Sequence, residues 1–166
     1  MVLGTEVQKA INEQINDELY SAYLYLSMSA YCDTSNLLGF AHWMRLQSQE
    51  ELTHAMKLFD FVHDRGGQAL LKAINQPPAD FKSPLDVMEQ ALAHERQVSQ
   101  MIHRLYEFAT NEKDYATLAQ LQWFLLEQVE EEKRASEIVQ QIKLAGNQGP
   151  ALLLLDRQLG SRTLSR

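Results

Sequence analysis

The sequence predicts an all-α fold: a four-helix bundle with one long crossover connection and a short fifth helix at its C-terminal end. Three observations predict it. The 166 residues include seven Gly and four Pro, too few for the frequent turns that strands require. Residues 85–145 contain neither. Four long segments also carry apolar side chains at spacings of three and four, the period of an amphipathic helix.

The first two helices are predicted to form a hairpin. Thr5-Glu6-Val7-Gln8 has the form of a capping box, which satisfies the free amides at the start of a helix. The first helix is therefore expected over residues 5–33. A run of cap and turn formers, residues 33–36, separates it from a second helix over residues 36–65. Gly66-Gly67 ends that helix because glycine accepts left-handed backbone geometry.

A long connection, residues 66–83, leads to the second predicted hairpin. Ser83-Pro84 supplies an N-cap and a first helical residue, and the third helix extends to about Thr110. Residues 111–114 form a short turn, a fourth helix follows to about Ala145, and a short fifth helix covers residues 150–159. The long connection lets the third helix begin at the same end as the second. We expect residues 1–166 to form a single domain.

Composition excludes several classes of partner. The chain is 45% hydrophobic and 22% charged, which is ordinary for a folded protein. Its net charge of −7, with no basic cluster, argues against nucleic acid as a partner. The longest aliphatic run, residues 151–155, is too short to span a membrane. The N-terminus lacks signal-peptide features, and the single Cys32 fits a reducing compartment. We therefore expect a cytoplasmic protein that binds neither nucleic acid nor membrane.

One glutamate near mid-helix interrupts the apolar stripe of each long helix. These residues are Glu18, Glu51, Glu95 and Glu131. The two glutamates of each hairpin are equally distant in sequence from the centre of its turn. Such residues lie at the same height in an antiparallel helical hairpin. If the two hairpins pack together, four carboxylates therefore meet in one layer of the core.

This layer predicts a metal site. Ionised carboxylates buried together repel one another and are poorly solvated, and no Lys or Arg interrupts the four stripes at this height. Glu51-Leu52-Thr53-His54 is a Glu-x-x-His motif, which places a carboxylate and an imidazole one turn apart; the motif is found among the inward ligands of di-iron bundles. Oxygen ligands with one histidine suit Fe(II), with Mn(II) possible and Zn(II) as a competitor.

Several residues beside the layer allow two interpretations. Glu50, Glu127 and Glu130 form either a solvated face or a further metal site. Tyr25 and Trp123 follow the helical spacing of core residues, but near a redox metal either could donate an electron. The remaining histidines fall outside the layer and are expected to be surface or hydrogen-bonded residues: His42, His63, His94 and His103.

Taken together, these residues resemble the non-haem bacterial ferritins over nearly the whole chain. The resemblance rests on residues 16–21, 49–54, 94–95, 122–123 and 127–133. It implies the ferritin-like fold and a homo-oligomeric cage of 24 subunits. Such a cage oxidises Fe(II) with oxygen or peroxide and stores ferric mineral inside.

The resemblance also implies three iron sites. The first would use Glu18, Glu51 and His54. The second would use Glu51, Glu95 and Glu131, with Gln128 nearby. A third, looser site would draw on Glu50, Glu127 and Glu130, with Tyr25 adjacent. No haem is expected, because Leu52 stands where bacterioferritins carry the methionine that binds it.

Two other functions remain open at the level of sequence. One is a rubrerythrin-like peroxidase or another di-iron oxidase on the same bundle, although one cysteine cannot build the usual rubredoxin-like cluster. The other is a scaffold without metal, which leaves the four mid-helix glutamates without a compensating positive charge. The leucine run over residues 152–155 would stay exposed on an isolated subunit and therefore predicts a subunit contact.

Overall fold

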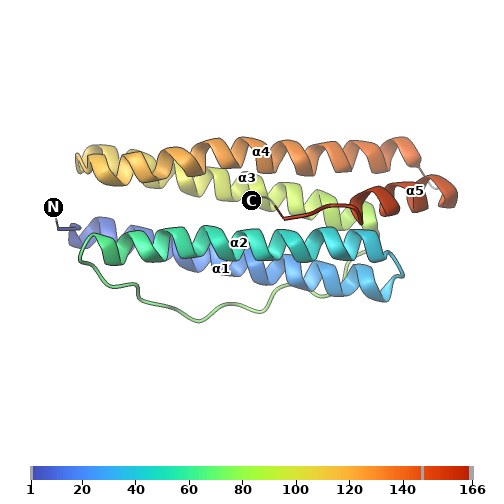
Figure 1. Cartoon of the computed structure of the whole chain (residues 1–166), viewed down its shortest axis with the longest axis horizontal. Helices are drawn as coiled ribbons and strands as arrows, with labels where there is room; N and C mark the ends of the chain where they lie inside the picture. The colour runs from blue at the N-terminus through green and yellow to red at the C-terminus, as the bar shows by residue number, and fades with distance from the viewer. Residues whose placement is uncertain (1, 147, 165–166) are drawn as a thin grey trace.

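The computed structural model describes residues 2–146 and 148–164, and this part of the chain forms five helices and no strand (Figure 1). The helices are α1 (Thr5–Thr34), α2 (Leu38–Asp64), α3 (Pro84–Asn111), α4 (Tyr115–Ala145) and α5 (Gly149–Leu159). Their bounds agree with the predicted ranges to within two residues. The predicted all-α bundle with a crossover and a fifth helix is confirmed.

Helix capping agrees with the prediction at α3 and differs at α1. The Ser83 hydroxyl accepts a hydrogen bond from the Asp86 N–H (3.1 Å), as expected of an N-cap. At α1 the N-cap residue is Gly4 and no side chain caps the helix, so the predicted capping box is wrong. Gln8 Oε1 instead accepts a hydrogen bond from the N–H of Gln68 in the long connection between α2 and α3 (3.1 Å). The Gln8 side chain therefore does not cap the start of α1.

The helices pair as two antiparallel hairpins, α1 with α2 and α3 with α4 (Figure 1). The crossover, residues 65–83, extends along the α1–α2 hairpin, so that α2 and α3 point in the same direction. At one end, the Arg65 guanidinium donates to both carboxylate oxygens of Asp114 (3.0 and 3.2 Å). This bidentate pair joins the end of α2 to the start of α4.

The core consists of two hydrophobic clusters with a polar layer between them. One cluster, toward α5, includes Met28, Met44, Met88 and Ile138. The other, toward the N-terminus, includes Ile11, Leu58, Ile102 and Leu121. On each long helix the predicted glutamate lies between its residues of the two clusters, and all four glutamates are at most 2% exposed. Their predicted burial is confirmed.

Helix α5 packs across the start of α2. The N–H of Phe40 donates to Asp156 Oδ1 (2.9 Å), so that α5 supplies a cap for α2. Gly39 allows the approach, because a Cβ atom there would lie 1.6 Å from the Asp156 carbonyl oxygen. Leu155 is buried against the core, whereas Leu153 and Leu154 are exposed. No helix in the described residues is long and apolar enough to cross a membrane.

Candidate metal centre

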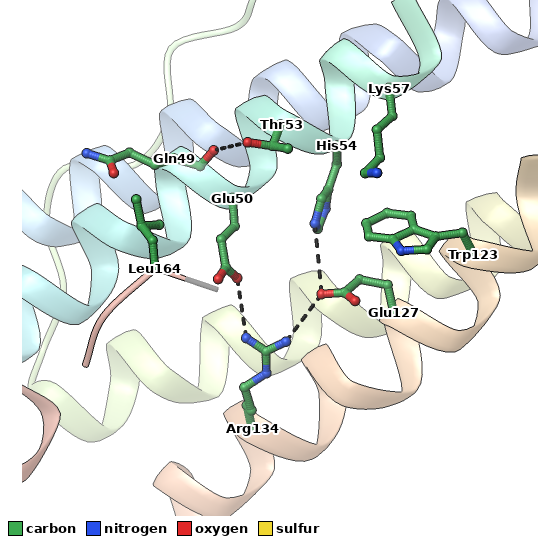
Figure 2. A pocket seen from close by; sticks show the side chains of 9 residues that line it. All are labelled: Gln49, Glu50, Thr53, His54, Lys57, Trp123, Glu127, Arg134 and Leu164. Atoms are coloured by element: carbon green, nitrogen blue, oxygen red, sulfur yellow. Dashed lines mark hydrogen bonds and ion pairs between the residues drawn. The ribbon is translucent and has the colours of Figure 1, made fainter. Parts of the chain in front are cut away.

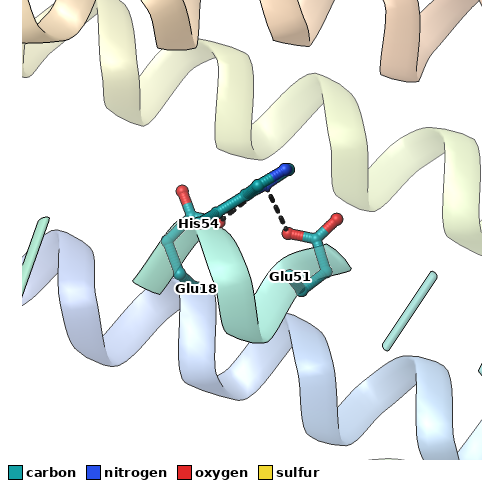
Figure 3. Close-up of side chains that lie close together, drawn as sticks. All are labelled: Glu18, Glu51 and His54. Atoms are coloured by element: carbon teal, nitrogen blue, oxygen red, sulfur yellow. Dashed lines mark ion pairs between the residues drawn. The ribbon is translucent and has the colours of Figure 1, made fainter. Parts of the chain in front are cut away.

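Glu51 and His54 on α2 face Glu18 on α1 in the middle of the bundle. His54 Nδ1 lies 3.3 Å from Glu51 Oε2 and 3.8 Å from Glu18 Oε2 (Figure 3). Glu51 and His54 share a face because they are one turn apart, and Glu18 reaches them from α1. All three side chains are buried, and together they could hold a metal ion.

A second group joins α2 to the other hairpin. Glu51, Glu95 and Glu131 each offer a carboxylate oxygen, and these atoms lie within 4.8 Å of one another. Glu51 belongs to both groups. Because a carboxylate has two oxygens, the Glu51 side chain could contact two cations at once, as a bridge between adjacent sites.

The four carboxylates are held where ionisation is unfavourable. Burial raises the pKa of Glu95 to about 7 and that of Glu131 to about 8. The pKa values of Glu18 and Glu51 are also raised well above the usual range, first by burial and then by the neighbouring carboxylates. A bound divalent cation would replace the protons that these groups otherwise hold.

Three glutamine amides orient the carboxylates. Gln14 Nε2 donates to Glu18 (2.9 Å), and Gln128 Nε2 donates to Glu95 (3.2 Å). Gln47 Nε2 donates to both Glu51 (3.0 Å) and Glu131 (2.7 Å). The sequence prediction missed the roles of Gln14 and Gln47. Each precedes its glutamate by four residues, which is a spacing that could have indicated a contact on one helix face.

The centre keeps two oxygens free of hydrogen bonds. Glu18 Oε2 and Glu131 Oε1 are buried and have no hydrogen-bond partner among the described residues. Glu18 Oε2 lies 3.8 Å from His54 Nδ1, and Glu131 Oε1 lies 3.8 Å from Arg134 Nη2. Buried oxygens of this kind carry a large desolvation cost, which a cation would offset. The oxygen-rich donor set with one imidazole fits Fe(II).

The two aromatic residues lie at different sides of the centre. Tyr25 is buried, and its hydroxyl donates to Glu95 Oε1 (2.5 Å). It therefore contacts the group of Glu51, Glu95 and Glu131, and its place beside the looser third site stays a prediction. The Trp123 ring meets the His54 ring edge-on, with centroids 5.2 Å apart, and the Lys57 ammonium lies over it.

A pocket of about 440 Å³ opens beside His54 (Figure 2). Glu50 and Glu127 line it, and Arg134 lies between them, 3.3 Å from Glu50 Oε2 and 3.2 Å from Glu127 Oε1. The sequence prediction missed this arginine. Glu130 is exposed and belongs to none of the metal-capable groups found among the described residues. The structure thus does not bring the three predicted residues of the looser site together.

The histidines outside the centre lie as predicted. His94 is buried with its Nε2 2.7 Å from the Ser21 hydroxyl, and burial lowers its pKa to about 4. It is a hydrogen-bonded core residue. The others are exposed: His42, His63 and His103.

Fold and site together define a four-helix bundle whose buried carboxylate and histidine groups could hold metal. The family model of the ferritin-like domain matches residues 8–145. A bacterial non-heme ferritin of Bacteroides fragilis (strain 638R) is 45% identical over 161 residues, covering 97% of this chain and all of the relative. A bacterial non-heme ferritin of Staphylococcus epidermidis (strain RP62A) is 39% identical and covers 99% of each chain.

Solved structures agree with these relatives. The crystal structure of an open pore ferritin from Archaeoglobus fulgidus superposes with a TM-score of 0.97 at 50% identity, covering 98% of this chain and all of that one. An engineered closed form of the same ferritin gives the same TM-score and identity. The chain belongs to the ferritin family.

Proposed function

We propose that this ferritin stores and detoxifies iron by oxidising Fe(II) at the centre described above and depositing ferric mineral inside a protein cage. One Fe(II) would be bound by Glu18, Glu51 and His54. The other would be bound by Glu51, Glu95 and Glu131, with Gln128 nearby, whose amide donates to Glu95. The observation that carries the proposal is that Glu51 is common to both groups.

The residues of the centre have three tasks in this reaction. The carboxylates bind Fe(II) and, as hard anionic oxygens, stabilise Fe(III) more than Fe(II), which makes oxidation easier. The glutamine amides hold the carboxylates in place, so that little rearrangement is needed during oxidation. Glu95 and Glu131 release protons when iron binds, because their raised pKa values leave Glu95 partly protonated and Glu131 mostly protonated near neutral pH in its absence.

Tyr25 is proposed to supply an electron to oxygen or peroxide as it is reduced at the centre. Burial holds the pKa of its phenol well above the usual value, so the hydroxyl is neutral. Loss of an electron would make the phenol proton acidic, and Glu95 Oε1 already accepts the hydrogen bond from that proton. The electron would pass to the oxidant and the proton to Glu95. Trp123, in edge contact with His54, is a second candidate donor.

The remaining features concern assembly and location. Exposed Leu153 and Leu154 on α5 support a homo-oligomer in which α5 lies at a subunit contact, and we propose the 24-subunit cage. We further propose a haem-free, cytoplasmic protein without nucleic-acid or membrane partners. Iron and the oxidant are its substrates.

Stopped-flow absorption after mixing the iron-free protein with Fe(II) and oxygen tests the chemistry. Glu51→Gln and His54→Ala are expected to slow the fast oxidation phase at least tenfold, since both remove ligands of the first iron. The matched controls are Glu107→Gln and His103→Ala, which change exposed residues. Unchanged fast oxidation in both site variants would refute the assignment.

Iron loading separates storage from oxidation alone. After gel filtration and aerobic loading, hundreds of irons retained per assembly indicate storage. About two per chain, on a monomer or dimer, would indicate only an oxidase.

A further inference from the structure

The C-terminal tail, residues 160–164, turns back from α5 toward the middle of the bundle and lies against α2 (Figure 1). Arg162 anchors the tail there. Its guanidinium stacks over the Trp43 ring (4.5 Å to the centroid) and donates to the Trp43 carbonyl (3.2 Å). The Arg162 carbonyl lies 2.9 Å from His42 Nε2. Only 12% of the Arg162 side chain is exposed, so this residue is held on several sides.

The same guanidinium reaches the residue that supports the metal centre. Arg162 Nη2 donates to Gln47 Oε1 (2.9 Å) and pairs with Glu50 Oε2 (2.9 Å). Gln47 is fully buried, and its Nε2 donates to Glu51 and Glu131. A continuous set of hydrogen bonds therefore joins the tail to the bridging glutamate.

Donor and acceptor chemistry fixes the direction of the Gln47 amide. A guanidinium has only donors, so the amide oxygen must face Arg162. The two N–H bonds must then face the carboxylates, which accept one each. Without the arginine, the amide could rotate about its last torsion, and its oxygen would then repel the Glu51 and Glu131 carboxylates.

We propose that Arg162 is a positioning residue for the metal centre: through Gln47 it holds the bridging Glu51 and its partner Glu131 in the orientation that binds metal. This inference rests on the proposed function of the centre. It assigns a role in the site to a tail residue outside the four-helix bundle. Charge alone would give the opposite result. A positive charge near the site weakens cation binding, so loss of the Arg162 charge would by itself strengthen it.

Co(II) titration of the iron-free, full-length protein tests this inference, since Co(II) reports both affinity and ligand geometry through its visible absorption. Arg162→Met keeps an unbranched apolar stem over Trp43 but removes the donors. It is expected to weaken Co(II) binding on the order of 10–100-fold, the usual cost of losing a group that orients metal ligands, and to change the absorption spectrum. Arg157→Met, at an exposed position of α5, is the matched control and should bind like the wild type.

A double-mutant cycle tests the route through Gln47. Gln47→Met removes the amide at similar volume, and in that background Arg162→Met should weaken Co(II) binding no further. Circular dichroism and gel filtration check that each variant folds and assembles.

The outcomes are distinct. Equal or tighter Co(II) binding by Arg162→Met overturns the inference, as does a loss of the same size in both backgrounds. A wild-type protein that binds no Co(II) overturns the proposed centre itself, and the positioning role with it.

Discussion

Tyr25 and Glu95 form a direct hydrogen bond inside the carboxylate layer, from the phenol of α1 to the carboxylate of α3. This bond opposes the effect of burial, because it lowers the pKa of Glu95 that desolvation raises. It therefore links an aromatic residue to the protonation state of a proposed iron ligand.

Tyr25→Phe is expected to raise the pKa of Glu95 further and weaken the second metal position. A hydrogen bond to a charged group contributes about 1.5–3 kcal/mol, so the second equivalent of Co(II) should bind about tenfold more weakly at pH 6.5, with the first equivalent little changed. Calorimetric titration measures both. Tyr23→Phe, at a half-exposed position of the same helix, is the control, and equal second-site affinity in the two variants would contradict the role assigned to Tyr25.

The stability of the iron-free protein should fall as pH rises from about 5 to 8. Glu95 and Glu131 have folded-state pKa values of about 7 and about 8, above the ordinary value of 4.5. At these two groups the folded state therefore binds more protons than the unfolded state within this window. Together they outweigh buried His94, whose pKa of about 4 acts in the opposite direction below pH 6.5. The stabilisation is complete below the unfolded pKa and is lost as pH rises through the folded pKa values. Thermal unfolding in the presence of a chelator measures the trend.

Metal should reverse that trend. Because a cation must displace the protons of Glu95 and Glu131, the increase in Tm on adding Zn(II) should grow between pH 6 and 8. Glu95→Gln removes one of the titrating groups and should flatten both curves. A Tm that does not depend on pH in the chelated wild type would show that the carboxylate layer is ionised without metal.

The carboxylate layer could be predicted from sequence because helix periodicity and turn position are local properties. Each of the four glutamates lies on the apolar stripe of its helix, and the two in each hairpin are equally distant from the turn. These positions predict that the four side chains meet once the helices pack. Arg162 could not be predicted in this way, since the tail after α5 has no period that places its side chain. Arg134 lies one turn after Glu131, yet only the structure shows that it turns toward Glu50 and Glu127.

The capping error at α1 has a similar cause. Thr5 and Gln8 have the spacing of a capping box, but the Gln8 side chain bonds to the crossover residue Gln68, which is 60 positions away in sequence. A tertiary contact thus overrides a local pattern. Local patterns were sufficient where no distant partner competes, as at Ser83.

Arg134 is expected to limit metal binding at the pocket beside His54. If Glu50 and Glu127 hold a third, looser iron, that ion must compete with Arg134, which pairs with both, and with Arg162, which pairs with Glu50. Arg134→Gln should therefore tighten binding of a third Co(II) per chain several-fold, measured by equilibrium dialysis. Arg45→Gln, at an exposed position of α2, controls for net charge. Unchanged stoichiometry and affinity would favour the solvated-face interpretation of these glutamates.

Asp114 is expected to stabilise the end of the bundle in two ways. Its carboxylate accepts from the Thr117 N–H as the N-cap of α4 and pairs with Arg65 at the end of α2. Asp114→Ala removes both and should destabilise the protein by about 1–3 kcal/mol, because a lost cap alone costs about 0.5–2 kcal/mol. Asp114→Asn keeps a capping oxygen and should retain part of the stability. Thermal scans at matched protein concentration measure the difference, and equal losses would assign the whole effect to the ion pair.

Gly39→Ala should dislodge α5 and, with it, the tail that carries Arg162. A Cβ atom at position 39 would lie 1.6 Å from the backbone carbonyl oxygen of Asp156. A side-chain rotation cannot relieve an overlap with backbone, so α5 must move away and Asp156 must give up its bond to the Phe40 N–H. Trypsin should then cleave after Arg157 faster than in the wild type, and Co(II) affinity should fall as in Arg162→Met. Gly149→Ala is the matched control, because nothing lies within 4 Å of the Cβ atom that it adds. Faster cleavage with unchanged Co(II) affinity would show that the docked tail does not support the metal centre.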